Sequence, residues 1–331
     1  MQSATCSIAA FFFGGLAMRH CRYETQHALH SPERRRLMQR TVQGAFGGLI
    51  LPVAGSALLT ACGGNDSTAT TMPTGPAPVA PTPILASVNN FRDVAGADDH
   101  MAYRTASGQK LRRGVFYRSN ALALSAADLT TINTLGIKVV YDLRTGTEVT
   151  QVPDTVPAGA KYVNVDVLGS GNVVLPTLQS PADAAAFMEK IERQFVTDAG
   201  IRARIGEVLT GMANGANAQL FHCTAGKDRA GWIAAILLTL ADVPQSVVIQ
   251  DYLLTNIYSA ASIESQYNAM ITGYGQSYAD NFYPLLGVQT RFLLAGFNQA
   301  VTSYGSMSGY ITEGLNLSSS TQNLLKSKLL G

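Results

Sequence analysis

The chain has 331 residues, a formal net charge of +2 and 14% charged residues, which is an ordinary soluble composition. Its near-neutral charge gives no support to nucleic acid as a partner. The length allows one large domain or two. We divide the chain into an export signal over 1–61, a tether over 62–84 and one folded domain over 85–331.

The first part has the layout of a signal peptide. A basic cluster at Arg34–Arg36 precedes an apolar run over 45–59, which is too short and glycine-rich for a comfortable transmembrane helix. The tail L-T-A-C, ending at Cys62, resembles a bacterial lipobox, and R-R-R-L-M from Arg34 resembles a twin-arginine signal. We expect an exported bacterial protein, lipid-anchored to the cell envelope through Cys62 and facing the periplasm or the exterior. The alternative is a signal cleaved elsewhere, with Cys62 incidental.

The tether follows the expected anchor. Residues 63–83 are mostly Gly, Ser, Thr, Ala and Pro, and they lack the apolar bulk that a core needs. Their prolines favour extended structure. We therefore expect this stretch to link a lipid anchor to the folded domain.

The first half of the folded domain alternates strands with a helix. A short strand is predicted at 114–118. The run S-A-A-D from Ser125 resembles a capping box, and it begins a predicted helix that ends at Gly136. The apolar run 137–143 is typical of a buried strand, and 161–167 alternates like another strand.

The second half continues the alternation. Helices are predicted from about 181 to 196 and across 201–212, where apolar residues recur at helical spacing. A short apolar strand at 218–221 precedes a glycine loop, and 232–240 is apolar on every side, as in a buried helix. The remainder, after Asp242, is mostly helical by pattern. The order of elements predicts an α/β domain whose sheet includes parallel pairs.

The loop F-H-C-T-A-G-K-D-R-A-G carries the chemistry, with Cys223 and Arg229 spaced as C-x5-R. Between a strand end and a helix start, successive backbone N–H groups and the helix dipole favour a dianion. Gly226 lets the backbone approach that anion, and the Arg229 guanidinium can fork two hydrogen bonds onto phosphate oxygens. The same positive field favours a thiolate over a thiol, so we expect Cys223 to be ionised. The residues expected to bind phosphate are Thr224, Ala225, Gly226, Lys227 and Arg229.

These groups suit transfer of a phosphoryl group to sulfur. The thiolate of Cys223 attacks phosphorus, and water then hydrolyses the phosphocysteine. Arg229 and the loop N–H groups stabilise the charge on the equatorial oxygens. We expect Asp228, inside the loop, to be the general acid and then the general base for water.

Four other polar residues receive lesser roles. Lys227 adds positive charge at the rim. His222 is interpreted as a structural brace for the loop rather than a proton carrier. Asp142 and Asp166 are reserve general acids, although their places at strand ends favour structural roles.

A metal site is not expected. The cysteines are Cys6, Cys21, Cys62 and Cys223, and their spacing matches no zinc pattern. After export processing two cysteines and two histidines would remain, too few for a His/Cys metal site. No organic cofactor is implied either.

Several segments together resemble a known family, the secreted bacterial tyrosine phosphatases of the protein tyrosine phosphatase B type. The resemblance begins at about residue 89 and spans the folded domain. The segments are H-C-T-A-G-K-D-R at 222–229, N-F-R-D at 90–93, R-G-V-F-Y-R-S at 113–119, V-Y-D-L-R at 140–144 with Glu148, and the run from Tyr304 to Leu315.

The resemblance implies a cysteine-phosphatase-like fold: a central, mostly parallel sheet flanked by helices, a helical C-terminal part and a possible helical lid, for which 169–196 is the candidate. It implies hydrolysis of phosphotyrosine, and possible dual specificity or phosphoinositide hydrolysis. The expected partners are thus a phosphorylated protein or a phosphoinositide, and the membrane through the anchor. The family's nucleophile, arginine and aspartate correspond to Cys223, Arg229 and Asp228. Its lysine, linked to lipid-phosphate recognition, corresponds to Lys227.

One residue departs from the pattern. Cysteine phosphatases commonly have a serine or threonine after the arginine, and this chain has Ala230. The missing hydroxyl affects hydrolysis of the phosphocysteine, unless Thr224 substitutes. The main alternative is a pseudophosphatase that binds phosphorylated ligands without turnover. Other thiolate-loop enzymes, such as a sulfurtransferase or an arsenate reductase, and a non-enzymatic surface lipoprotein are further alternatives.

Overall fold

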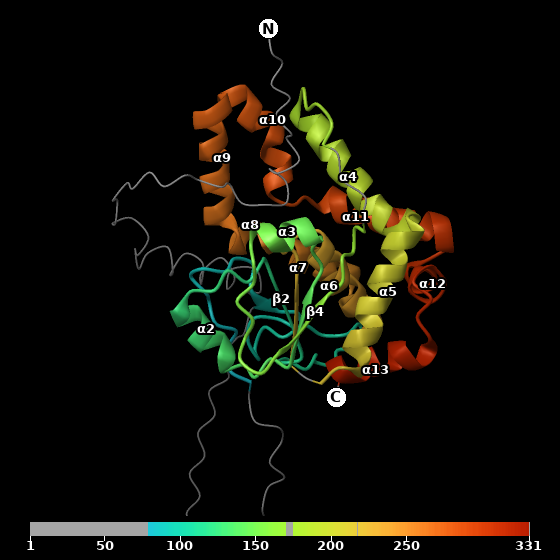
Figure 1. Ribbon diagram of the computed structural model, residues 1–331. Helices are drawn as coiled ribbons and strands as arrows, with labels where there is room; N and C mark the ends of the chain where they lie inside the picture. The colour runs from blue at the N-terminus through green and yellow to red at the C-terminus, as the bar shows by residue number, and fades with distance from the viewer. Residues whose placement is uncertain (1–78, 170–174, 217, 331) are drawn as a thin grey trace, which may run out of the picture. The chain divides into compact units, whose positions relative to one another are not determined.

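The computed structural model describes residues 79–169, 175–216 and 218–330, and Figure 1 shows their arrangement. The predicted export signal, Cys62 and most of the tether lie outside these ranges. Within them, no helix combines the length and the apolar character needed to cross a membrane.

The described part of the chain contains one five-stranded sheet in the order β1-β2-β5-β3-β4. Only β1 and β2 pair in antiparallel fashion, and the other neighbours are parallel. The predicted mostly parallel sheet is thereby confirmed. The strands are β1 (Arg92–Asp93), β2 (Phe116–Ser119), β3 (Val139–Asp142), β4 (Lys161–Asn164) and β5 (Gln219–His222).

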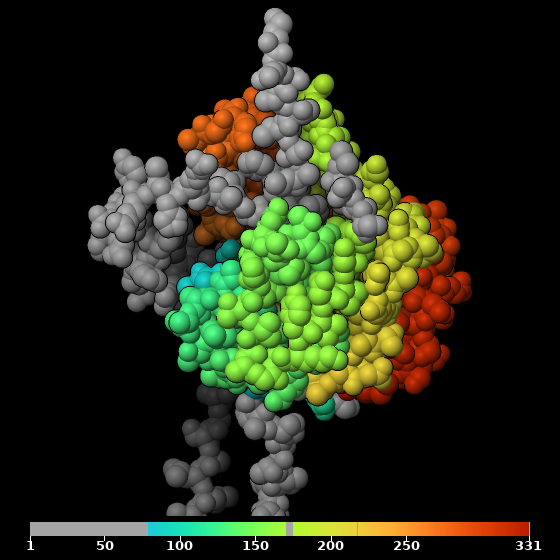
Figure 2. Space-filling view, viewed as in Figure 1, coloured from blue at the N-terminus to red at the C-terminus, as the bar shows by residue number. Residues whose placement is uncertain are grey.

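Helices flank this sheet and make up the C-terminal third, as predicted (Figure 1). The helix α10 packs against both α4 and α9, and these three stand together at the top of Figure 1. In Figure 2 the gold surface of α5 meets the red surface of the C-terminal helices, where α13 packs against it. The helices are α2 (Ala126–Asn133), α3 (Gly146–Gln151), α4 (Pro181–Thr197), α5 (Ala199–Asn214), α6 (Arg229–Leu240), α7 (Gln245–Leu253), α8 (Thr255–Tyr258), α9 (Ala260–Tyr274), α10 (Gln276–Leu286), α11 (Thr290–Tyr304), α12 (Met307–Gly309), the π-helix η2 (Tyr310–Gly314) and α13 (Ser319–Leu330).

The central strands are buried on both faces. In β3, Val140 packs into one apolar cluster with Leu220 of β5, whereas Tyr141 packs into the other cluster with Phe221. Successive side chains of a strand point to opposite faces, so one apolar run serves two cores. This explains why the sequence shows these strands as nearly continuous apolar stretches.

Trp232 fixes the helix that follows the glycine loop. Its indole N–H donates to the Tyr310 hydroxyl at 3.1 Å, and that hydroxyl donates to the carbonyl of Phe195 at 2.8 Å. A Cβ on Gly296 would lie 2.5 Å from the Trp232 ring, so α11 needs glycine there to approach α6 this closely. The cluster thereby joins α6, α4, α11 and η2 behind the loop.

The predicted capping box at Ser125 is half right. The Ser125 hydroxyl accepts from the Asp128 N–H at 3.2 Å and begins α2. The Asp128 carboxylate instead accepts the N–H of Ser87 at 2.6 Å, because that segment packs beside the helix start. A complete capping box begins α3, a helix that the sequence reading missed, between Thr145 and Glu148.

Candidate active site

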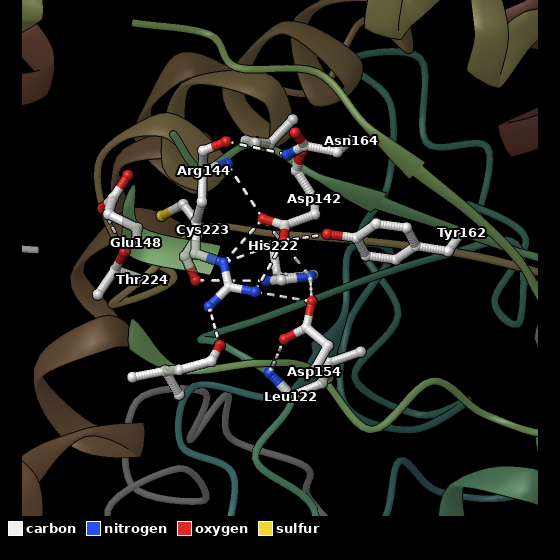
Figure 3. A network of polar contacts seen from close by, with 12 residues as sticks. Leu122, Asp142, Arg144, Glu148, Asp154, Tyr162, Asn164, His222, Cys223 and Thr224 are labelled. Carbon is white, nitrogen blue, oxygen red and sulfur yellow. Dashed lines mark hydrogen bonds and ion pairs between the residues drawn. The ribbon is translucent and has the colours of Figure 1, made fainter. Parts of the chain in front are cut away.

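The glycine loop connects the central strand β5 to α6. The strand ends at His222 and the helix begins at Arg229, so the loop lies at the carboxyl edge of the parallel strands. Cys223 is a free thiol and only 2% exposed. In Figure 3 its sulfur lies near Thr224 of the loop and Glu148 of α3.

The underside of the loop is held through its carbonyl groups. The Asn90 side-chain amide donates to the Gly226 carbonyl at 2.8 Å, and Arg118 donates to the same oxygen at 2.7 Å. Arg118 also reaches the Lys227 carbonyl at 3.4 Å. The N–H and C=O of a trans peptide point in opposite directions, so binding these carbonyls from below turns the following N–H groups toward the upper side.

Asp251 of α7 anchors this underside. Its carboxylate accepts from Arg92 at 3.2 Å, from Arg118 at 3.1 Å and from the Tyr103 hydroxyl at 3.2 Å. Burial, followed by the nearby charge of Arg92, lowers the pKa of Arg118 to about 10. Asn90 adopts a left-handed backbone (φ 58°), which asparagine tolerates better than most residues. The N-F-R-D segment is therefore a support for the loop.

Gly226 has a packing role that the sequence did not suggest. Its φ is 68°, and a Cβ there would lie 2.5 Å from the carbonyl carbon of Ser119 and 2.7 Å from the N atom of Asn120. The glycine is required because the loop packs directly on the backbone that follows β2. This packing contact is a further reason for glycine here, and the approach of the loop backbone to an anion stays a prediction.

Glu148 forms a bidentate ion pair with the arginine of the loop. Its two carboxylate oxygens accept from Arg229 at 2.8 and 2.7 Å, and Arg229 also donates to the Leu143 carbonyl at 3.2 Å. Burial disfavours the charged forms, but the mutual hydrogen bonds outweigh it, so the pKa of Glu148 is lowered and that of Arg229 raised. The sequence reading did not assign Glu148 this role, although the T-x-x-E pattern at Thr145 could have placed it at a helix start.

Two residues bear on the missing serine or threonine. Ala230 is fully buried in the first turn of α6. The Thr224 hydroxyl donates to Glu148 and lies 3.4 Å from an Arg229 nitrogen. In this arrangement Thr224 supports the arginine clamp rather than replacing the absent hydroxyl beside Cys223.

His222 belongs to a buried polar network behind the loop, shown in Figure 3. Its Nε2 lies 3.0 Å from Asp154, and its Nδ1 lies 3.4 Å from the Cys223 carbonyl. Arg144 pairs with Asp142 at 2.7 Å and with Asp154 at 2.8 Å. These contacts agree with the interpretation of His222 as a brace.

The same network removes Asp142 from the reserve acids. Burial acts to raise the pKa of Asp142, but hydrogen bonds from Arg144 and the charge of His222 outweigh it, and the pKa falls to about 2. Such a carboxyl is a poor proton donor near neutral pH. Asp142, Asp154 and His222 could also converge on one cation. The Arg144 guanidinium already supplies positive charge to both carboxylates there, so the residues fit an ion-pair network better than a metal centre.

The neighbouring residues Asp228 and Lys227 differ in where their side chains lie. Asp228 lines the cleft above Cys223. Lys227 was expected at the rim, but its ammonium group is buried and donates to the carbonyls of Leu285 and Gly287 at the end of α10. Asp166, the other reserve acid, is half-buried in a turn, and burial raises its pKa.

The cleft has apolar walls from three helices and from Leu168, which lies between β4 and α4. The candidate lid 169–196 contributes α4 to these walls, while 170–174 lie outside the described residues. The opposite wall comes from α9 and α10, which the sequence reading did not assign to the site. The wall side chains are Leu168, Phe187, Met188, Ile191, Phe195, Met270, Phe282, Leu285 and Leu286.

The site therefore joins a thiol, a clamped guanidinium and a carboxyl at the start of a helix. Comparison with known proteins identifies this combination: a family model described as "Tyrosine phosphatase family" matches residues 83–331. The chain belongs to the tyrosine phosphatase family. The predicted resemblance to the bacterial B-type phosphatases is confirmed, and the protein is a protein-tyrosine phosphatase.

Relatives of this phosphatase agree along most of their length. A Cupriavidus necator protein named "Putative tyrosine-protein phosphatase" is 33% identical over 255 residues, covering 72% of this chain and 90% of that protein. The "Triple specificity protein phosphatase PtpB" of Mycobacterium tuberculosis is 30% identical over 285 residues, covering 73% and 96%. A "Tyrosine-protein phosphatase" of Nostoc commune is 29% identical over 197 residues, covering 57% and 65%.

Proposed function

We propose that this phosphatase works through a phosphocysteine on Cys223. The thiolate attacks phosphorus, the P–O ester bond breaks, and Asp228 gives its proton to the leaving oxygen. Water then attacks phosphorus, Asp228 takes the proton of that water, and the S–P bond breaks to release phosphate. Arg229 and the loop N–H groups stabilise the charge on the equatorial oxygens in both steps.

The observation that carries this proposal is the clamp on Arg229. Glu148 holds the guanidinium by two hydrogen bonds, next to a buried thiol at the start of α6. A preorganised donor pair loses little on binding a dianion, because it does not have to reorient. A pseudophosphatase could use the same clamp for binding alone, so turnover must be measured.

The test is the hydrolysis of p-nitrophenyl phosphate and a phosphotyrosine peptide by wild type, Cys223→Ser and Asp228→Asn. We expect Cys223→Ser to abolish turnover while phosphate still binds. We expect Asp228→Asn to lower kcat by about 10²-fold or more, in the range of general acid catalysis. Turnover by Cys223→Ser would contradict the nucleophile, and an unchanged rate for Asp228→Asn would contradict the acid.

We also propose that the substrate range extends beyond phosphotyrosine to phosphoserine, phosphothreonine and phosphoinositides. The support is the apolar cleft, which can bury an aromatic ring or the acyl part of a lipid, and the name "Triple specificity protein phosphatase PtpB" of the Mycobacterium relative. The test is to compare kcat/KM for a phosphotyrosine peptide, a phosphoserine peptide, a phosphothreonine peptide and a phosphoinositide. Activity confined to the phosphotyrosine peptide would contradict the wider range.

We propose, finally, that the enzyme is exported and anchored to the cell envelope by a lipid on Cys62. The support is the sequence pattern alone, since Cys62 lies outside the described residues. Labelling of the expressed protein with a fatty-acid analogue tests the anchor. Cys62→Ala should lose the label and leave the membrane fraction, and label retained on Cys62→Ala would contradict the proposal.

A further inference from the structure

Glu192 of α4 is a buried carboxyl beside the active-site cleft that the proposed mechanism does not use. Its side chain is fully buried, and its neighbours Met188, Ile191 and Phe195 line the cleft. The Tyr252 hydroxyl donates to its Oε1 at 3.1 Å, whereas its Oε2 is buried with no hydrogen-bond partner in the described part of the chain. An unsatisfied buried polar atom is costly, and natural proteins keep few of them.

Asp228 has the matching feature. Its Oδ1 is also buried without a hydrogen-bond partner among the described residues. The Tyr252 ring, whose hydroxyl binds Glu192, would lie 3.0 Å from a Cβ on Gly231 in the first turn of α6, three residues after Asp228. The charge of Asp228 also acts on both Glu192 and Tyr252, so the three groups lie in one buried region. The other charged groups that act on Glu192 are Lys227 of the loop and Arg118 of β2.

When two carboxyl groups lie in one buried region, ionising both of them costs much more free energy than ionising one. Burial, followed by the negative charge of Asp228, raises the pKa of Glu192 well above its usual value. This shift favours the neutral form of the Glu192 carboxyl. A neutral carboxyl carries one O–H donor, and an ionised or neutral Asp228 carries an acceptor at Oδ1.

We propose that Glu192 is a positioning residue that acts through Asp228, with its protonated Oε2 supplying the donor that the buried Oδ1 of Asp228 lacks. The inference rests on the proposed role of Asp228 as general acid. A hydrogen bond to Oδ1 fixes the Asp228 carboxyl and leaves Oδ2, which lies 3.7 Å from the Lys227 ammonium nitrogen, for proton transfer. Glu192 keeps its own proton throughout, while Asp228 gives one proton to the leaving oxygen and regains one from water.

The test compares Glu192→Gln with Glu192→Leu in the full-length enzyme. The amide of Gln is neutral and keeps both a donor and an acceptor, whereas Leu keeps neither. We expect Glu192→Leu to lower kcat on a phosphoserine peptide, whose leaving group needs a proton, by about tenfold or more. Glu192→Gln should recover most of that loss, and inhibition by inorganic phosphate should stay unchanged in both variants.

Two further measurements separate positioning from a purely structural role. In an Asp228→Asn background, Glu192→Leu should cause no additional loss, because the residue through which it acts is gone. Across pH, the rate of Glu192→Gln should fall less steeply on the alkaline side than that of wild type, since Gln cannot ionise. Glu189→Gln, a change at a partly exposed glutamate one turn earlier on α4 that pairs with Arg193, is the control and should follow the wild-type profile.

Two outcomes would overturn the inference, and a third would overturn the proposed general acid. An equal loss from Glu192→Leu with and without Asp228 would make Glu192 structural and overturn the inference. Superposed pH profiles of wild type and Glu192→Gln would overturn it as well, even if the leucine variant does not fold. If Asp228→Asn itself left the rate unchanged, the proposed general acid would fail instead, which is a separate result.

Discussion

The floor of the active-site cleft is the glycine loop, which buried pairs of charged groups support, whereas its walls consist mostly of apolar side chains from α4, α9 and α10. Below the loop, Arg92 and Arg118 both form ion pairs with Asp251. Beside the loop, Arg229 forms an ion pair with Glu148. Walls and floor meet at polar contacts, among them the bond that Lys227 donates to the end of α10.

The difference indicates that the floor and the walls have separate tasks in the reaction. A preorganised charged floor sets the chemistry, because its groups need not move when charge develops on the phosphate. Apolar walls set which ester fits, because they contribute burial without fixed direction. Changes in the floor should therefore alter kcat/KM for every substrate, and changes in the walls should alter it selectively.

The largest expected effect comes from breaking the clamp with Glu148→Gln. One oxygen of Gln can still accept, but the charge and the fork are lost. We expect kcat/KM to fall by about 10²-fold for both p-nitrophenyl phosphate and a phosphotyrosine peptide, in the range seen for a lost transition-state donor. A loss confined to one substrate would contradict the assignment of Glu148 to the floor. Thr150→Val, an exposed change on α3, is a suitable control.

The same variant gives a pH-dependent stability difference. The pKa of Glu148 is lowered in the folded state, where burial is outweighed by the hydrogen bonds from Arg229. Its stabilisation is present above its unfolded pKa of about 4.3 and is lost as pH falls through the folded value. The gap in unfolding free energy between wild type and Glu148→Gln should therefore narrow from pH 7 toward pH 3. A gap of constant size would contradict the ion pair.

A smaller effect is expected from the walls. Ile191→Ala removes a partly buried apolar side chain that lines the cleft. We expect KM for a phosphotyrosine peptide to rise by about tenfold, as for a few lost methylene groups. Inhibition by inorganic phosphate, which touches only the floor, should be unchanged. A weaker phosphate affinity would show that floor and walls are not separable.

The smallest effect is expected where floor and wall meet. Lys227→Gln shortens the side chain that donates to Leu285 and Gly287. Loss of such hydrogen bonds costs about 1–3 kcal/mol, and we expect it as faster hydrogen exchange in α10 with a modest change in kcat. Lys190→Gln on α4 is the control. Unchanged exchange in α10 would contradict the contact.

Local pattern was enough to predict four of the five described strands, the helices α2, α4, α5 and α6, and the glycine loop. The loop stands out because C-x5-R lies between an apolar strand and an apolar helix, and these are all neighbours in sequence. The helix α3 and the short strand β1 were missed because neither carries enough apolar periodicity to stand out. Six-residue α3 begins with a capping box, which is a local signal that could have been used.

The supports of the loop could not be predicted in the same way. Asn90 and Arg118 reach the Gly226 carbonyl from 136 and 108 residues away, and Glu148 reaches Arg229 from 81 residues away. Such pairs depend on how the elements pack, which a single sequence does not display. For the same reason the direction of Lys227 and the wall from α9 and α10 were not foreseen.

The most direct test of the central claim is to trap the intermediate. Wild-type enzyme would be mixed with a phosphotyrosine peptide, quenched in acid within its first turnover, digested and analysed by mass spectrometry. The account predicts one phosphoryl group on the peptide that contains Cys223, and none on that peptide in Cys223→Ser. A phosphoryl group on another residue, or dephosphorylation by Cys223→Ser, would contradict it.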